Sequence, residues 1–242
     1  MTVPRILATC GGWADASWGD VRFGPLLRYA LDLTGVEGRP RVVFVNTAGG
    51  DQRVDEGREL AAAMAAGVDA VHLRLFGRTA VDLDDVVGPA DLVWVGGGSV
   101  ANLLPVWRTH GLDAVLRRAW EGGAVLAGTS AGALCWHEGG PTSGFGEIRT
   151  ITDGLGFIPG SLGVHYDSQV ERRPALHTAV GSGQLPGGFG LDEGTGVLYE
   201  EARAVDFVTE LPGGQVHRVD RVGDGDGDGD GVVEEAVATR AL

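Results

Sequence analysis

Short apolar runs alternate with helically spaced apolar positions along the first half of the chain. Residues 5–9 and 41–45 are largely apolar and end at segments rich in glycine or asparagine, as buried strands that lead into loops do. Residues 23–33 and 54–66 instead carry apolar side chains three and four positions apart, which is the spacing of an amphipathic helix. The pattern predicts a strand, a helix, a second strand and a second helix, in that order.

The same alternation continues to about residue 140. It predicts strands over 70–75, 91–95 and 124–127, and helices over 100–108, over 112–120 and from residue 131 onward. Strands that alternate with helices form a mostly parallel sheet with helices on both faces. We therefore expect an α/β fold in which the loops after the strands share one edge of the sheet, where open α/β sheets bind their ligands.

The periodicity weakens beyond residue 140, where glycine and proline interrupt the chain. Short strands are predicted over 189–191, 196–199 and 215–219, and we expect them to form a small antiparallel C-terminal extension of a single domain, residues 1–242. The Gly-Asp repeat over 223–231 has few side chains to bury, which predicts a flexible loop. A calcium site is the weaker interpretation, because an EF-hand also needs a Glu after a longer spacer.

A candidate nucleophile follows the strand over 124–127. The run Gly128-Thr129-Ser130-Ala131-Gly132 places Ser130 in the Gly-x-Ser-x-Gly pattern of a nucleophile elbow. The two glycines allow a sharp reversal of the chain, and the N–H group of Ala131 would lie beside the carbonyl under attack. The alternative is a turn of small residues with a buried serine.

Three glycines, Gly96-Gly97-Gly98, follow another predicted strand. Bare main chain can approach a ligand closely there and point N–H groups at it, so Gly97 or Gly98 is the candidate second oxyanion donor. A phosphate-binding loop is not favoured. The Gly-Lys-Ser or Gly-Lys-Thr of a Walker loop is missing, and Ala101 stands where a dinucleotide motif has its third glycine.

A serine nucleophile needs a base and an acid that orients the base. Among the six histidines, His165 lies at the end of a short apolar run, a strand-end position like those of the other candidate loops. Asp192 and Glu193 close a predicted strand at a glycine turn, and either carboxylate could hold an imidazole. The order serine, acid, histidine of α/β-hydrolases would instead use His217, in a predicted hairpin.

Four ordered motifs span most of residues 5–200: Val95-Gly96-Gly97-Gly98-Ser99 with Asn102-Leu103-Leu104, then Gly128 to Gly132, His165-Tyr166-Asp167, and Leu191-Asp192-Glu193-Gly194. Together they resemble the peptidase E family of serine peptidases, which includes α-aspartyl dipeptidases and, more distantly, cyanophycinases. The resemblance implies a fold similar to that of class I glutamine amidotransferases, with serine in place of their cysteine. The resemblance implies that Ser130 is the nucleophile, His165 the base and Glu193 the acid that orients it, with Asp192 as the alternative acid. It also implies that the oxyanion donors are the N–H groups of Ala131 and of Gly97 or Gly98.

The resemblance also implies a substrate. Family dipeptidases favour an N-terminal aspartate, and a guanidinium can make two parallel hydrogen bonds to its carboxylate. Arg172 and Arg173, near His165 in sequence, are the candidates, and a solvated charge pair is the alternative. The chain departs from the dipeptidase pattern over 140–163 and lacks a proline before the acid at 191–193, which leaves the substrate open.

We thus expect a serine hydrolase, without cofactor or metal, that cleaves small peptides through an acyl-enzyme on Ser130. Two alternatives remain. One is a non-catalytic ligand-binding homologue, and the other is an esterase or acyl transferase that uses the same serine.

Composition and charge limit the kinds of partner that the protein can bind. The chain is 43% hydrophobic and has a formal net charge of −14, which repels nucleic acid and anionic membranes. No apolar stretch approaches the roughly 20 residues of a membrane helix, and the N-terminus lacks the layout of a secretion signal. Cys10 and Cys135 are too few for a disulfide framework. We expect a cytoplasmic protein, monomeric or homodimeric, whose partner is a small peptide.

Overall fold

Five parallel strands form the centre of the protein, in a computed structural model that describes residues 3–77, 81–222 and 231–242. Neighbouring strands pair in parallel along the order β1 (Arg5–Thr9), β7 (Val125–Thr129), β6 (Leu92–Val95), β4 (Arg41–Val45) and β5 (Asp69–Leu73). Beyond β1 the sheet continues with β12 (Thr195–Glu200), β13 (Arg203–Thr209) and β16 (Arg240–Ala241), to eight strands in all. β12 is antiparallel to β1 and β13 is antiparallel to β12, so the sheet is mixed with a parallel centre.

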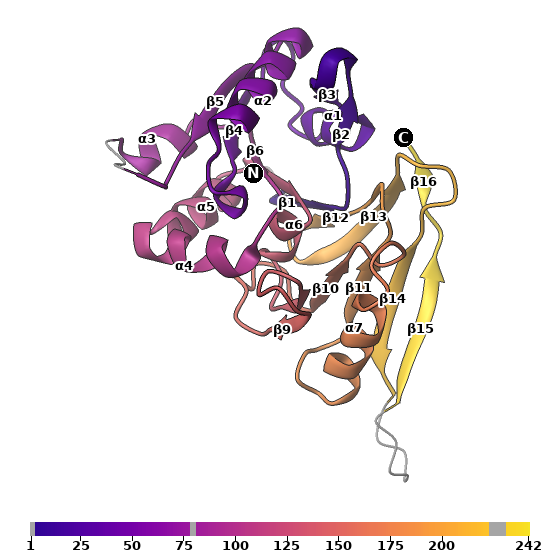
Figure 1. Ribbon diagram of the computed structural model, residues 1–242. Coiled ribbons are helices and arrows are strands. Elements are labelled where there is room, and N and C mark those ends of the chain that lie inside the picture. Colours follow the sequence, from indigo (N-terminus) through magenta and orange to yellow (C-terminus); the bar gives the residue numbers. More distant parts are fainter. Residues whose placement is uncertain (1–2, 78–80, 223–230) are drawn as a thin grey trace.

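Alternate residues of the central strands are buried on opposite faces of this sheet, as the period of a strand requires. Leu7, Phe44 and Trp94 pack on the face that is covered by α1 (Pro25–Asp32) and α2 (Arg53–Ala66). Val43 and Val95 pack on the other face, which is covered by α3 (Leu83–Val87), α4 (Val100–His110), α5 (Leu112–Glu121) and α6 (Ala131–Leu134) (Figure 1). The α/β class with helices on both faces is therefore confirmed.

The ends of the helices follow local chemistry. The Ser99 hydroxyl accepts a hydrogen bond from the N–H group of Asn102 and caps α4. Gly111 then ends α4 with a φ angle of 73°, a left-handed conformation that glycine adopts readily, and α5 begins directly after it.

The C-terminal part is larger than the three predicted short strands. A second sheet has the order β10 (Ser161–Val164), β11 (Gly188–Leu191), β14 (Val216–Arg221) and β15 (Val232–Val237). β10 and β11 are parallel, whereas β14 and β15 pair antiparallel. The helix α7 (Arg172–Gly181), which the sequence did not predict, packs on this sheet through Leu176 and Val180 (Figure 1).

Short elements complete the described residues. They are the 3-10 helices Ser17–Gly19 and Thr47–Gly49 and the strands β2 (Trp13–Asp15), β3 (Val21–Phe23), β8 (Gly140–Thr142) and β9 (Arg149–Ile151). Residues 223–230 of the Gly-Asp repeat, for which a flexible loop is predicted, lie outside the described residues. Within the described part of the chain, no helix is both long and apolar enough to cross a membrane.

Candidate active site

Ser130 lies in a strained turn between β7 and α6. Its φ angle of 55° and ψ angle of −113° are rare for a residue with a side chain. The flanking glycines are required by close packing, because a Cβ atom at Gly128 or Gly132 would collide with the carbonyl oxygen of Val95 in the neighbouring strand β6. The Gly-x-Ser-x-Gly pattern therefore has a steric cause in this fold.

The imidazole of His165 meets this serine. Ser130 Oγ lies 2.8 Å from His165 Nε2, within hydrogen-bonding distance. His165 follows β10 directly and has a φ angle of 57°, so the end of the second sheet turns its side chain toward the end of β7. The two residues are brought together by two different sheets.

Glu193 completes a chain of hydrogen bonds. Its Oε1 atom lies 2.5 Å from His165 Nδ1 and also accepts a hydrogen bond of 2.8 Å from the hydroxyl of Ser168. Burial would raise the pKa of Glu193, but the hydrogen bonds from His165 and Ser168 outweigh it and hold this pKa below its ordinary value. The carboxylate is therefore ionised at neutral pH and fixes the proton of His165 on Nδ1, which leaves Nε2 free to accept from Ser130.

Asp192 points elsewhere. Its carboxylate lies 3.3 Å from His217 Nε2 and accepts a hydrogen bond from the backbone N–H of Gln215. His217, the histidine of the rival order, is a residue of β14, and its partners are Asp192, Glu234 and Arg173. Of the two neighbouring acids, Glu193 is thus the one in contact with His165.

Cys10 is a neighbour that the sequence analysis missed. Its side chain is 1% exposed, and its Sγ atom lies 3.5 Å from His165 Nδ1 and 3.4 Å from Glu193 Oε2. The ligand atoms of these three residues lie within 4.8 Å of one another, a spacing that a metal ion requires. Burial and then the charge of Glu193 raise the pKa of the Cys10 thiol, so a metal ion could bind there only by displacing the thiol proton.

Main-chain N–H groups surround the serine. Gly97 packs against Ser130 so closely that a Cβ atom on it would lie 3.3 Å from the Ser130 Cβ atom. Gly98 has a φ angle of 133°, and a side chain there would collide with the main chain of Ala48. Within the described residues the N–H groups of Gly97 and Gly98 have no hydrogen-bond acceptor. The N–H group of Ala131 lies in the first turn of α6, where a helix has no carbonyl oxygen to accept from it.

The two predicted substrate arginines both have partners inside the protein. Arg172 is 4% exposed, and its guanidinium donates to the carbonyl oxygen of Pro141 and to the side chains of Ser143 and Gln169. Arg173 pairs with Glu234 at 2.6 Å. Arg172 is therefore not part of a solvated charge pair. That Arg172 or Arg173 contacts the substrate stays a prediction.

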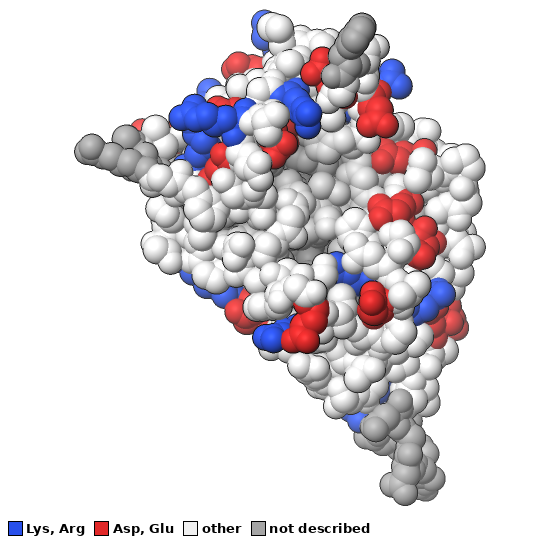
Figure 2. Space-filling view, in the orientation of Figure 1, with Lys and Arg blue, Asp and Glu red and all other residues white. Residues whose placement is uncertain are grey.

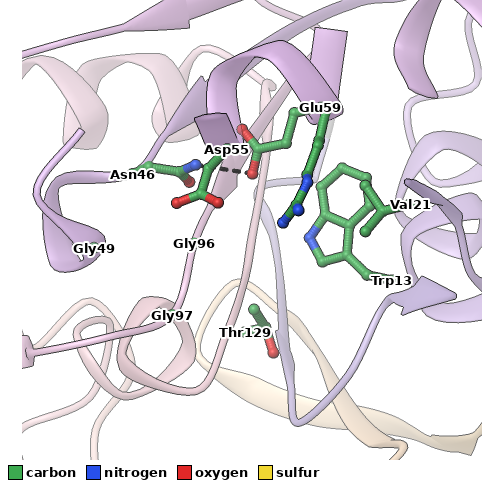
Figure 3. A pocket seen from close by; sticks show the side chains of 10 residues that line it. Trp13, Val21, Asn46, Gly49, Asp55, Glu59, Gly96, Gly97 and Thr129 are labelled. Carbon is green, nitrogen blue, oxygen red and sulfur yellow. Dashed lines mark hydrogen bonds between the residues drawn. The ribbon is translucent and has the colours of Figure 1, made fainter. Parts of the chain in front are cut away.

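A cavity of about 260 Å³ opens beside the Ser130 turn. Trp13 forms one side of it, and Asn46, Asp55 and Glu59 gather across from that ring, as Figure 3 shows. Its remaining lining residues are Val21, Gly49, Arg58, Gly96, Gly97 and Thr129. In the orientation of Figure 1 the surface is hollowed near the middle of the molecule, with charged side chains of both signs around the hollow (Figure 2).

Similar proteins point to one class of enzyme. The model of peptidase family S51 matches residues 18–206. The chain is 37% identical over 192 residues to the uncharacterized peptidase YgaJ of Bacillus subtilis (strain 168), which covers 79% of this chain and 83% of that protein. It is 35% identical over 111 residues to Peptidase E of Shigella flexneri, which covers 44% of this chain and 47% of that protein.

A solved structure shares the fold. A peptidase from an acI-B1 Actinobacterium superposes with a TM-score of 0.61 at 18% sequence identity, over 98% of this chain and 95% of that one.

Proposed function

The chain belongs to peptidase family S51, and we propose that it cleaves small peptides with Ser130 as its nucleophile. Membership in the family makes it a peptidase. One observation supports the serine mechanism above all others. The hydroxyl of Ser130, the imidazole of His165 and the carboxylate of Glu193 form one continuous chain of hydrogen bonds.

The proposed reaction begins when Ser130 Oγ attacks the carbonyl carbon of the peptide bond and its proton passes to His165 Nε2. Glu193 stabilises the imidazolium that forms. His165 then gives the proton to the leaving amine as the C–N bond breaks, which leaves an acyl ester on Ser130. Water attacks that ester with His165 as the base again, and the acid product leaves as the Ser130 hydroxyl is restored.

The charge that develops on the carbonyl oxygen would be held by main-chain N–H groups. Ala131 and one of Gly97 and Gly98 are the proposed donors, because their N–H groups lack acceptors among the described residues and Gly97 packs against Ser130. Each such donor contributes about 3 kcal/mol to the transition state in comparable enzymes. No cofactor enters any of these steps.

We propose that the substrates are dipeptides with an N-terminal aspartate. We also propose that the protein acts in the cytoplasm and binds neither nucleic acid nor membranes. The net charge of −14 supports the last point, since it repels both kinds of polyanion.

The test replaces the nucleophile. Ser130→Ala should lower the turnover of an Asp-Xaa dipeptide about a millionfold and should abolish labelling by a fluorophosphonate. Ser182→Ala, which removes an exposed hydroxyl after α7, is the matched control and should change neither. Turnover that persists in Ser130→Ala contradicts the mechanism. A protein that labels at Ser130 but hydrolyses only esters is instead an esterase or acyl transferase.

A further inference from the structure

Two opposite charges of α2 line the cavity without pairing. Arg58 and Asp55 are three residues apart on this helix, a spacing at which side chains are neighbours and can form an ion pair. Within the described residues neither side chain has a hydrogen-bond or ion-pair partner. Both charges are therefore free to bind a ligand.

Glu59, the other acidic residue of the lining, has neighbouring polar groups. Glu59 accepts a hydrogen bond of 2.8 Å from Asn46, drawn as a dashed line in Figure 3, and lies 3.1 Å from His72. Arg172 and Arg173 are held by internal contacts, as described above. Among the described residues that line the cavity, Arg58 is the one cation, and Asp55 is the carboxylate that lacks a partner.

We propose that Arg58 binds the side-chain carboxylate of an acidic N-terminal residue of the substrate and that Asp55 binds its α-ammonium group. The assignment rests on the proposed function, because it places the acyl part of the peptide in the cavity beside Ser130. A guanidinium matches a carboxylate through two parallel hydrogen bonds, and a carboxylate matches an ammonium group. Against a net charge of −14, an acidic substrate needs such a local cation.

The presence of both charges selects this occupant over a C-terminal residue. An N-terminal aspartyl or glutamyl residue carries an ammonium group and a carboxylate, so it is complementary to Asp55 and Arg58 together. A C-terminal residue would bring its α-carboxylate to Arg58 without an ammonium group, and Asp55 would repel it.

The size and walls of the cavity agree with a single residue. Its volume of about 260 Å³, that of roughly nine waters in the liquid, leaves ample room for one amino-acid residue. The cavity lies next to the Ser130 turn, because Gly97 and Thr129 line it and Thr129 directly precedes Ser130. Trp13 supplies an apolar wall for the methylene part of the side chain.

Binding to the inert Ser130→Ala protein tests the assignment without turnover. Calorimetric titration should show Asp-Leu binding at least about tenfold tighter than Asn-Leu, which differs in one charge-assisted contact. Adding Arg58→Gln should remove that preference, and adding Asp55→Asn should weaken both peptides to a similar extent. Amidation of the C-terminus of Asp-Leu should leave its affinity within about threefold, since the proposed contact is to the side chain.

Arg53→Gln is the matched control, because Arg53 is an exposed arginine of the same helix that does not line the cavity. It should preserve the preference for Asp-Leu. The assignment is overturned by equal binding of Asp-Leu and Asn-Leu, by a preference that survives Arg58→Gln, or by an Arg58 effect that disappears on amidation. Failure of the proposed function looks different, because a protein that binds Asp-Leu through Arg58 without cleaving it contradicts the serine mechanism alone.

Discussion

The backbone N–H group of His165 donates a hydrogen bond of 3.3 Å to the Sγ atom of Cys10, which ties the end of β10 to the end of β1. The same thiol donates to Glu193 Oε2 at 3.4 Å. Cys10 thus contacts both the proposed base and the proposed acid, and its protonated thiol helps to hold them in place. We infer that Cys10 is a positioning residue.

Cys10→Ala should lower kcat about 10- to 100-fold, because a small displacement of a catalytic group is costly. The change should fall on kcat and leave KM nearly constant, since Cys10 does not line the cavity. Cys10→Ser restores a donor and an acceptor and should recover most of the rate. Steady-state kinetics with thermal melts of all three proteins separates this effect from a loss of folded protein. Equal loss in Cys10→Ala and Cys10→Ser would contradict the positioning role.

Glu193→Gln should lower kcat/KM about 10⁴-fold, as the loss of the orienting carboxylate does in serine proteases with a Ser-His-Asp triad. The pKa of Glu193 lies below its ordinary value, so the carboxylate is ionised throughout the range from pH 5 to pH 9. The variant should therefore be less active than the wild type at every pH in that range, which steady-state kinetics from pH 5 to pH 9 will check. Equal kcat/KM of wild type and Glu193→Gln at neutral pH would contradict the orienting role of this carboxylate.

The parallel centre of the fold could be predicted because its strands carry a strong local signal. Residues 42–45 and 92–95 are apolar without interruption, since both of their faces are buried by helices. The helix α7 gives no such signal. It begins with two arginines and a proline, and its buried side chains, Leu176 and Val180, acquire an apolar surface to cover only when the second sheet is assembled.

Most residues of the candidate site could likewise be predicted from the sequence. Ser130, His165 and Glu193 each lie at a strand end with a glycine or an apolar run beside them, and the structure brings their side chains into contact. Cys10 could not be found, because its contact with His165 spans 155 positions and it resembles any small buried residue. Arg58 looks like one more solvated charge of an amphipathic helix until the cavity is seen.

His137 is a neutral histidine in the core, 1% exposed. Its Nδ1 atom lies 3.2 Å from the carbonyl oxygen of Ala133, which can only accept, so Nδ1 carries the proton and Nε2 accepts from the Tyr199 hydroxyl at 3.1 Å. Burial lowers the pKa of His137 from 6.5 to about 4, against a smaller opposing effect of the Ala133 carbonyl.

This burial should make the protein less stable in mild acid. Between about pH 6.5 and pH 4 the unfolded chain binds a proton at residue 137 that the folded protein excludes, so the free energy of unfolding falls as the pH falls. From pH 7 to pH 5 the loss due to this group is about 2 kcal/mol. Denaturant unfolding at both pH values should show a smaller difference for His137→Gln than for wild type. His110→Gln, at the exposed end of α4, is the control and should keep the wild-type difference. If His137→Gln shows the same difference as the wild type, His137 does not cause the acid sensitivity. Replacing a group that binds a proton only in the unfolded chain must change how the free energy of unfolding depends on pH.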